Sequence, residues 1–352
     1  MRRPLVALAL SLLVFAVAAA PRSTSHALLP NTLLVRVRDS LSGTPLPNAE
    51  VTAIGRKTLT GPQGQVRIVW PPEGVITLRV RQLGFRYVER TVQRGTSPTA
   101  TEDTLTIAMQ RAAFALPQVV AVAQTRCRDE EANAPPTPLS ASAMELLRFG
   151  AEQYGTFRAR YPFALTVVRR TELYNPYRNP YQSDPKPDST VELTDSNEWG
   201  DRYFPGRVLQ RTGAKSWFVP VLFVSALADS AFWARHCFVA RGVQEYGGRR
   251  VIRLDFSPAI DVNGAEWEGT ALIDSAASVL ARVEFRLTNL RAYGGPRRFE
   301  GYTVFTTPSP YIARPDSTVA RWISNGSATS ATGWSTQALV IRDVTYMKEA
   351  PP

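Results

Sequence analysis

The chain contains only two histidines and two cysteines among its 352 residues, and this shortage limits the chemistry that it can perform. A zinc peptidase needs at least two histidines with a carboxylate, or a set of thiolates, to hold its metal. His26 lies in the stretch predicted below to be a cleaved leader, which leaves one histidine, His236, in the mature chain. The sequence also lacks a Gly-x-Ser-x-Gly motif, a phosphate-binding loop and a dinucleotide fingerprint. We therefore expect no metal, no cofactor and no catalytic residues, and we predict that the protein is not an enzyme.

Long hydrophobic runs are also scarce, and the one that stands out has the pattern of a secretory signal peptide. Arg2 and Arg3 precede an apolar stretch from Leu5 to Ala20, and Ser25-His26-Ala27 offers small side chains for cleavage. A membrane anchor is the alternative, but this stretch is shorter than the roughly 20 residues of a spanning helix. We predict a signal peptide over residues 1–27, export, and no transmembrane span after cleavage. The mature chain would be periplasmic, associated with the outer membrane, or secreted.

The formal charge of +11 falls to +8 when the leader takes three arginines with it. The remaining arginines stand singly along expected strands, as Arg36, Arg253 and Arg282 do, and form no basic tract. This pattern is typical of solvated sheet faces. Attraction to an anionic envelope surface or to an acidic partner is the alternative, and we expect no binding to nucleic acid.

The chain has 27 prolines and 22 glycines but few runs with helical periodicity, and this favours β-strands joined by many turns. The fold is therefore predicted to be mainly β. The mature chain of about 325 residues is longer than a domain with a single hydrophobic core usually is, which predicts two or three domains. In the first of these, Leu33, Val35 and Val37 share one strand face, and turn residues separate further short alternating runs. We predict a β-sandwich of the seven-stranded type over residues 28–113.

Four stretches of this region resemble a known family. They are VRVRD (35–39), GTPLPNAEV (43–51), TGPQGQV (60–66) and VRQLGF (80–85). Their order resembles the carboxypeptidase regulatory-like domain, a transthyretin-like sandwich that also occurs at the N-terminus of many outer-membrane receptors. The family often has Asp in the turn where this chain has Pro62-Gln63-Gly64. The resemblance implies a non-catalytic module and no peptidase activity.

The second half of the chain predicts a larger, curved antiparallel β-sheet domain over residues 141–349, after a linker at 114–140. One short helix is expected at its start, because Ser142 and Glu145 have the spacing of a capping box and Gly155 can end the helix. GTALID (269–274) followed by LARVEF (280–285) resembles a hairpin of periplasmic lipoprotein-carrier-like sheets. The whole chain is similar to exported bacterial proteins with this N-terminal domain, which lend it no activity.

The two cysteines, Cys127 and Cys237, are predicted to form a disulfide in an exported chain. Such a bond would close a loop of about 110 residues and clamp the linker to the second domain. Free buried thiols, or a metal or catalytic role, are the alternatives. His236 is adjacent to Cys237, but neighbours on a strand point to opposite faces and are poor partners for catalysis.

Aromatic residues are frequent in the central third of the chain. Packing in the core of a curved sheet is one interpretation, and a concave sheet that holds an apolar or sugar ligand is the other. The candidate ligand-facing residues are Trp199, Trp217, Phe223, Trp233 and Trp267.

Three hypotheses of function follow. The first is a non-catalytic binding or assembly protein of the bacterial cell envelope, whose partner is an envelope protein, a glycan or a lipid. The second is a carrier-like protein with an apolar ligand in its C-terminal sheet, which an open hydrophobic cavity would favour over a filled core. The third is a hydrolase that uses Asp255 with Asp261, or Glu266 with Glu268.

Overall fold

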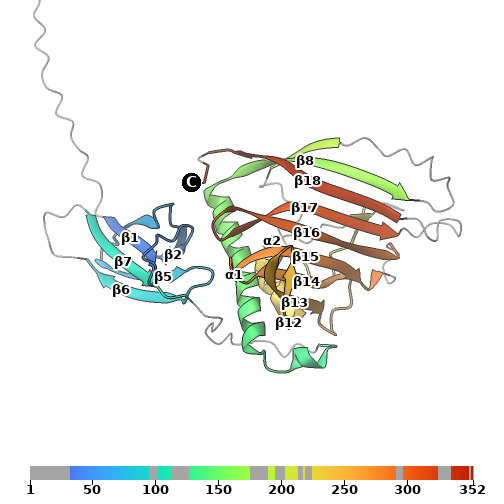
Figure 1. Ribbon diagram of the computed structural model, residues 1–352, viewed down its shortest axis with the longest axis horizontal. Coiled ribbons are helices and arrows are strands. Elements are labelled where there is room, and N and C mark those ends of the chain that lie inside the picture. Colours follow the sequence, from blue (N-terminus) through green and yellow to red (C-terminus); the bar gives the residue numbers. More distant parts are fainter. Residues whose placement is uncertain are drawn as a thin grey trace, which may run out of the picture.

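The computed structural model describes residues 32–94, 102–111, 127–174, 189–194, 203–212, 217–218, 224–290, 296–323, 334–348 and 350–351. Two domains lie side by side, and helix α1 stands between them (Figure 1). The predicted signal peptide and the first part of the predicted linker lie outside the described residues. None of the helices in the described part of the chain has the length and apolar content that a membrane crossing requires.

The N-terminal domain is a sandwich of two sheets, which confirms the prediction from alternation. Its strands are β1 (Thr32–Asp39), β2 (Glu50–Ala53), β3 (Arg56–Leu59), β4 (Gln65–Val69), β5 (Val75–Arg81), β6 (Val88–Gln93) and β7 (Glu102–Met109). The sheets have the orders β4-β1-β7 and β3-β2-β5-β6. β1 and β7 run parallel, in contrast to the antiparallel pairs of the rest of the domain. Alternate residues such as Val35 and Leu78 are completely buried between the two sheets.

The C-terminal domain is built on one antiparallel sheet of nine strands in the order β12-β13-β14-β15-β16-β17-β18-β8-β9. These strands are β8 (Phe163–Tyr174), β9 (Ser189–Thr194), β12 (His236–Tyr246), β13 (Arg249–Pro258), β14 (Glu266–Asp274), β15 (Val279–Thr288), β16 (Arg298–Ser309), β17 (Ile312–Ile323) and β18 (Trp334–Tyr346). The shorter elements are η1 (Glu130–Asn133), β10 (Gln210–Arg211), β11 (Trp217–Phe218), α2 (Val224–Ala228) and α3 (Ser230–Arg235).

Helix α1 is longer than the sequence predicts, and its predicted capping box is wrong. It spans Pro138–Arg160 rather than 142–155. The Thr137 hydroxyl caps the first turn by accepting a backbone N–H at 3.1 Å. Gly155 does not end the helix, because Phe157, two residues on, is completely buried, and such packing outweighs the cost of about 1 kcal/mol for a helical glycine. The expected single short helix is thus a long one, and two further α-helices accompany it.

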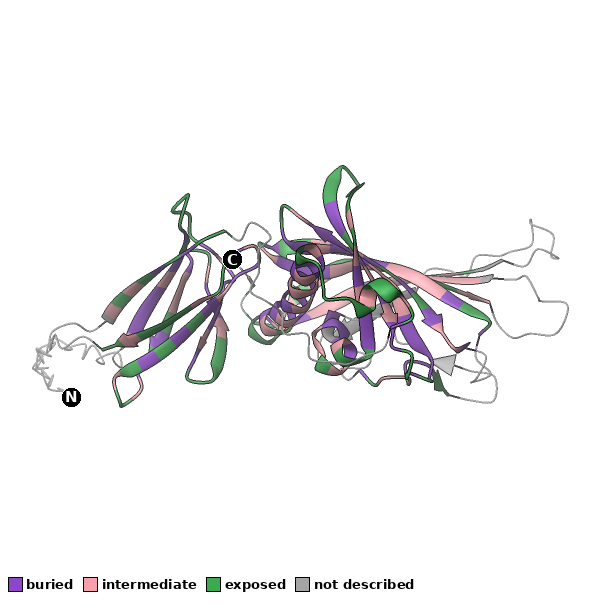
Figure 2. Cartoon of the chain, turned by 90° about the horizontal axis from the view of Figure 1, so that it is seen from below, coloured by how far each residue is buried: buried purple, intermediate pink, exposed green. Residues whose placement is uncertain are grey.

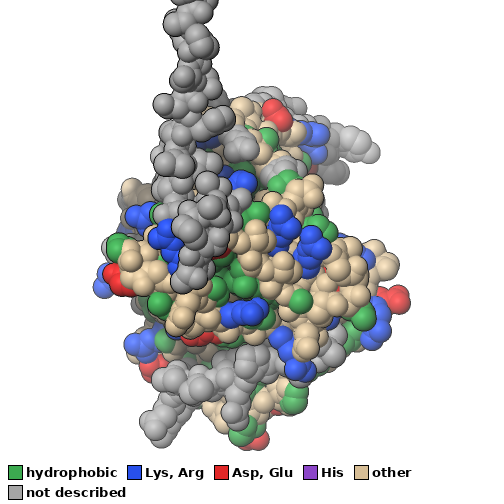
Figure 3. All heavy atoms as spheres, turned by 90° about the vertical axis from the view of Figure 1, so that its left-hand side faces the viewer, with side chains coloured by type: hydrophobic (Ala, Val, Ile, Leu, Met, Phe, Trp, Pro, Cys, Tyr) green, Lys and Arg blue, Asp and Glu red, His purple; other side chains and the backbone are tan. Residues whose placement is uncertain are grey.

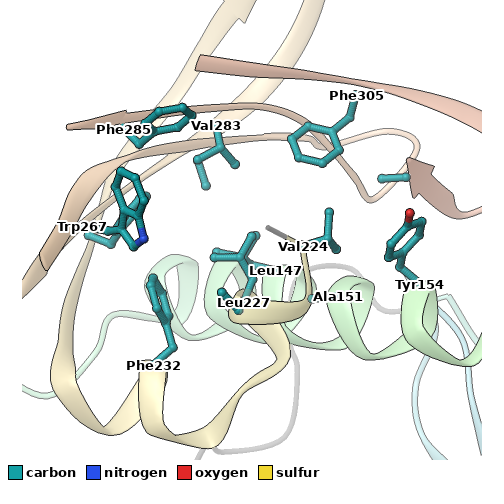
Figure 4. Close-up of a cluster of buried hydrophobic side chains, with 14 of the residues drawn as sticks. Leu147, Ala151, Tyr154, Val224, Leu227, Phe232, Trp267, Val283, Phe285 and Phe305 are labelled. Carbon is teal, nitrogen blue, oxygen red and sulfur yellow. The ribbon is translucent and has the colours of Figure 1, made fainter. Parts of the chain in front are cut away.

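One side of α1 packs on the inner face of the nine-stranded sheet, by which we mean the face turned toward the helices. Leu147, Ala151 and Tyr154 of α1 point toward Val283 and Phe305 of the sheet, and residues of α2 and α3 lie between them (Figure 4). A pocket of only about 10 Å³ remains between α1 and the sheet. This is room for a water molecule at most, so the described side chains that line this pocket pack closely.

Candidate functional site

The inner face is covered over only part of its width. α1 packs mainly against β12 to β15 and β17. On β15, which lies under α1, buried residues alternate strictly with less buried ones. β18 also lies inside the sheet, between β17 and β8, but none of its described side chains is buried. Residues of intermediate burial are accordingly frequent in the strands that extend away from α1 (Figure 2). The sheet therefore has apolar side chains that the described helices and strands do not bury in full.

We define the uncovered inner face by four half-buried apolar residues, which are Leu165 on β8, Trp322 on β17, and Leu339 and Ile341 on β18. Ile341 stands opposite Val167, whose side chain belongs to the buried core, and cross-strand partners share a face. Leu339 lies two residues away on the same strand and shares that face. Leu165 and Trp322 border the core cluster.

Sequence reasoning missed most of this surface. It placed Leu165 in a strand but did not single out Trp322, Leu339 or Ile341 for binding. The uninterrupted apolar run at 338–341 is the signal that could have found it, because a strand with one solvated face would alternate.

Among the five aromatic residues predicted to face a ligand, those that can be placed contribute to packing. Trp267 is only 2% exposed, and its ring centroid lies 5.3 Å from that of Phe285. Trp233 is half-buried and stacks on Phe238 at 4.3 Å, and its Nε1 donates to a backbone carbonyl at 2.7 Å. Trp199 and Phe223 lie outside the described residues, and the structure describes Trp217 by its backbone alone.

The opposite, outer face carries a groove of about 790 Å³ lined by charged residues. Glu268, Arg286, Glu300 and Arg321 stand opposite one another on β14 to β17, where Arg286 pairs with Glu268 and Arg321 with Glu300. Exposed pairs of this kind contribute at most about 1 kcal/mol each. Because these charges already have partners, an ionic ligand would have to break a pair to bind. We assign this charge ladder a structural role.

The predicted disulfide is present. Cys127 and Cys237 are bonded, with their Cα atoms 5.9 Å apart, and this fastens the segment before α1 to the first residues of β12. Asn133 holds the same segment by accepting the N–H of Cys127 at 2.8 Å and donating to its carbonyl at 2.9 Å. Arg241 of β12 adds an ion pair to Asp129. Cys237 therefore has no free thiol that could act as a nucleophile with His236.

His236 belongs to a buried polar cluster. Both ring nitrogens lie 2.9 Å from backbone carbonyl oxygens, those of Phe232 and Trp267. Glu266, completely buried beside it, accepts from the Tyr203 hydroxyl at 2.7 Å and from two backbone N–H groups. These groups bind one another and the backbone, so the cluster joins β12 and β14 to the segment that carries Tyr203.

Burial dominates the protonation of this cluster. It lowers the pKa of His236 to about 4, against the two carbonyl contacts, which act to raise it. Burial also raises the pKa of Glu266, against three hydrogen bonds that favour the carboxylate. At neutral pH the imidazole is uncharged and donates to one of its two carbonyl oxygens.

We expect the unfolding free energy to fall by about 3 kcal/mol as the pH drops from 6.5 to about 4, because of His236. In this window the unfolded chain binds a proton at the imidazole and the folded chain does not. Protonation of Glu266, whose folded pKa is raised, adds stability in acid and opposes the effect. Urea unfolding would give the slope of the unfolding free energy against pH for the natural protein and for His236→Phe. The difference between the two slopes measures the contribution of His236. Identical slopes would contradict the assignment.

The carboxylates considered for a hydrolase are held in separate contacts. Asp255 is bound by arginines, and hydrogen bonds lower its pKa although burial acts to raise it. Asp261 accepts from Arg235 at 2.5 Å, Glu266 is buried, and Glu268 belongs to the charge ladder. Within the described ranges, no group of three or more His, Cys, Asp and Glu side chains is placed to hold a metal ion.

The comparisons with known proteins agree with the fold of the N-terminal domain. The model of the carboxypeptidase regulatory-like domain matches residues 32–110, the span of the seven-stranded sandwich. Residues 32–110 are a carboxypeptidase regulatory-like domain. No curated protein matches the chain.

The regulatory-like domain accounts for about a fifth of the chain, and the solved structures add little on the remainder. A domain described as an outer membrane lipoprotein-sorting protein from Vibrio parahaemolyticus is 10% identical, covers 58% of this chain and 94% of its own, and has a TM-score of 0.27. A DUF1329 family protein from Desulfovibrio piger is 8% identical, with coverages of 60% and 94% and a TM-score of 0.31. A membrane-associated protein of unknown function from Bacteroides fragilis is 10% identical, with coverages of 90% and 98% and a TM-score of 0.19. Scores this low support no inference about function.

The regulatory-like domain docks on the second side of α1 through buried polar contacts. Gln153 of α1 is completely buried and donates to the Asn48 carbonyl at 2.6 Å and to Gln82 at 3.2 Å. The Asn48 side chain in turn donates to Ser309 at 2.7 Å and to the Pro310 carbonyl at 2.9 Å, in the β16–β17 turn. These contacts join the two domains through α1.

On the face that Figure 3 shows, Lys and Arg side chains stand in several separate places. An arginine of the regulatory-like domain that faces α1 has a defined role. Arg81 pairs with Glu145 at 3.2 Å and with Glu152 at 3.1 Å, and its guanidinium lies 4.0 Å from the ring centre of Phe149. This arginine is therefore part of the contact between the domains.

Proposed function

We propose that this protein is a non-catalytic binding protein of the cell envelope that holds an apolar ligand on the uncovered inner face. The observation that carries the proposal is β18, a strand inside the sheet whose described side chains include apolar ones and are none of them fully buried. Location in the envelope rests on the predicted leader. The packing of α1 on β12 to β15 supports a ligand position beside the helix, against β17, β18 and β8.

The apolar surface that a ligand would cover supports binding of moderate strength. Covering roughly 200 Å² of protein and a similar area of ligand contributes on the order of 10 kcal/mol at about 25 cal/mol per Å². Association itself costs at least about 4 kcal/mol. The remainder corresponds to dissociation constants in the range of tens of micromolar. The charge ladder offers less, because its ion pairs would have to be desolvated.

The test is titration with the uncharged fluorescent probe N-phenylnaphthylamine. We expect saturable binding to the natural protein and at least a tenfold weaker affinity in Leu339→Glu, which places a charge on the uncovered inner face. Val340→Glu is the matched control, because Val340 is the next residue of β18, is equally half-buried and points to the other face.

The outcome separates the hypotheses. Loss in Leu339→Glu with binding retained in Val340→Glu supports the proposal. Equal loss in both variants, or no saturable binding to the natural protein, overturns it.

A further inference from the structure

A pocket of about 180 Å³ lies between the regulatory-like domain and the C-terminal domain, away from the uncovered inner face. Its apolar lining comes from Leu83 and Phe85 of the regulatory-like domain and from Leu146 of α1. Hydroxyl groups of Ser278 and Tyr311 stand on the C-terminal side. Both domains and the helix between them are therefore needed to build it.

Arg111 brings a fixed positive charge to this pocket. Its Nε donates to Asp39 at 2.8 Å, and Asp39 is buried and also accepts the Leu41 N–H at 2.8 Å. The guanidinium lies 5.8 Å from the ring centre of Phe85. Asp39 thus holds the arginine through one nitrogen. The two terminal nitrogens donate no hydrogen bond to the residues that the structure describes, and this fork is the group that binds a carboxylate in a bidentate manner.

Two hairpin turns of the C-terminal domain form part of the pocket wall. Ser278 stands in the β14–β15 turn and Tyr311 in the β16–β17 turn, and both have the positive φ angles that such turns often need, 55° and 65°. Gly84, at φ 76°, approaches so closely that a Cβ there would lie 3.0 Å from the Ser278 hydroxyl. The turns and Gly84 therefore bring the two domains into close contact at this pocket.

We propose that this pocket binds a small carboxylic acid that carries one compact apolar group. The carboxylate lies on the terminal nitrogens of Arg111, and the apolar group lies on Leu83, Phe85 and Leu146. The pocket volume admits a group about the size of one amino-acid side chain. Because the walls belong to both domains, a bound acid also strengthens their docking. This site is independent of the apolar ligand proposed above.

The test is isothermal titration of the full mature protein with phenylacetate, hexanoate and N-acetylphenylalanine, each against its uncharged amide. We expect at least one acid to bind at least tenfold more tightly than its amide. Preference for N-acetylphenylalanine would indicate a peptide chain end, and preference for hexanoate a free short acid, and either supports the proposal. Equal affinity of acids and amides, or no binding of any acid, overturns it.

Three variants locate the binding. Arg111→Gln is expected to weaken acid binding tenfold or more. Ala276→Phe fills the pocket while leaving the pair of Arg111 and Asp39 intact, so it tests the site even where loss of that pair harms folding. Arg90→Gln, at another exposed arginine of the same domain, is the matched control and should bind as the natural protein does. Unchanged binding in both Arg111→Gln and Ala276→Phe contradicts the location.

Discussion

The double variant Cys127→Ser/Cys237→Ser is expected to lose about 5 kcal/mol of unfolding free energy. The disulfide joins residues 110 positions apart, and the chain-entropy model for a loop of this length gives nearly that value. Domains of this kind are stable by roughly 5 to 15 kcal/mol, so the loss is a third of the total or more. Guanidinium unfolding of the variant and of the oxidised natural protein measures the difference.

The control for this prediction is the natural protein treated with a thiol reductant, which should unfold at the same denaturant concentration as the double variant. Asn133 and Arg241 would still hold the segment before α1, so we expect the fold to persist with lower stability. A loss below about 1 kcal/mol would mean that these polar contacts, and not the covalent bond, restrain the linker.

The variant Trp267→Ala is expected to be less stable by about 3 to 5 kcal/mol, the usual cost of truncating a buried tryptophan. Trp267 is 2% exposed and lies between Phe285 at 5.3 Å and Phe299 at 6.1 Å, so its removal leaves a cavity in the core. Urea unfolding provides the measurement. Trp233→Ala, at a half-buried tryptophan that stacks on one ring, is the control and should cost clearly less.

The same variant tests the interpretation of the central aromatics. If Trp267 is a core residue, the Trp267→Ala variant is less stable, but in its folded state it binds N-phenylnaphthylamine with the affinity of the natural protein. Loss of probe binding with little loss of stability would instead make Trp267 a ligand-facing residue, as one reading of the sequence suggests.

Much of the fold could be predicted because a strand is recognisable from the alternation of apolar residues within a few positions. Alternation at Leu33, Val35 and Val37 fixes a strand and its buried face, and a chain with two cysteines allows only one disulfide pairing. The extent of α1 could not be predicted in this way. It is set by burial against two different domains, which holds Gly155 inside the helix although a glycine there favours an end.

The candidate sites depend still more on tertiary structure. Leu339 and Ile341 look like ordinary strand residues, and only the place of β18 beyond the reach of α1 leaves them half-exposed. Arg111 stands just after the sandwich in the sequence, and nothing local shows that Asp39 aims it at a pocket. The aromatic residues of the central third, by contrast, suggest a binding surface, yet Trp233 there packs against Phe238, and Trp267 further along the chain is buried in the core.

The central claim is that an apolar ligand occupies the uncovered inner face, and photolabelling tests it most directly. The mature protein would be irradiated with a fatty acid that carries a diazirine, and labelled residues would be mapped by tandem mass spectrometry. We predict labels on Leu165, Trp322, Leu339 or Ile341. Labels confined to Val319 and Val340, which point to the outer face, or to the regulatory-like domain would contradict the account.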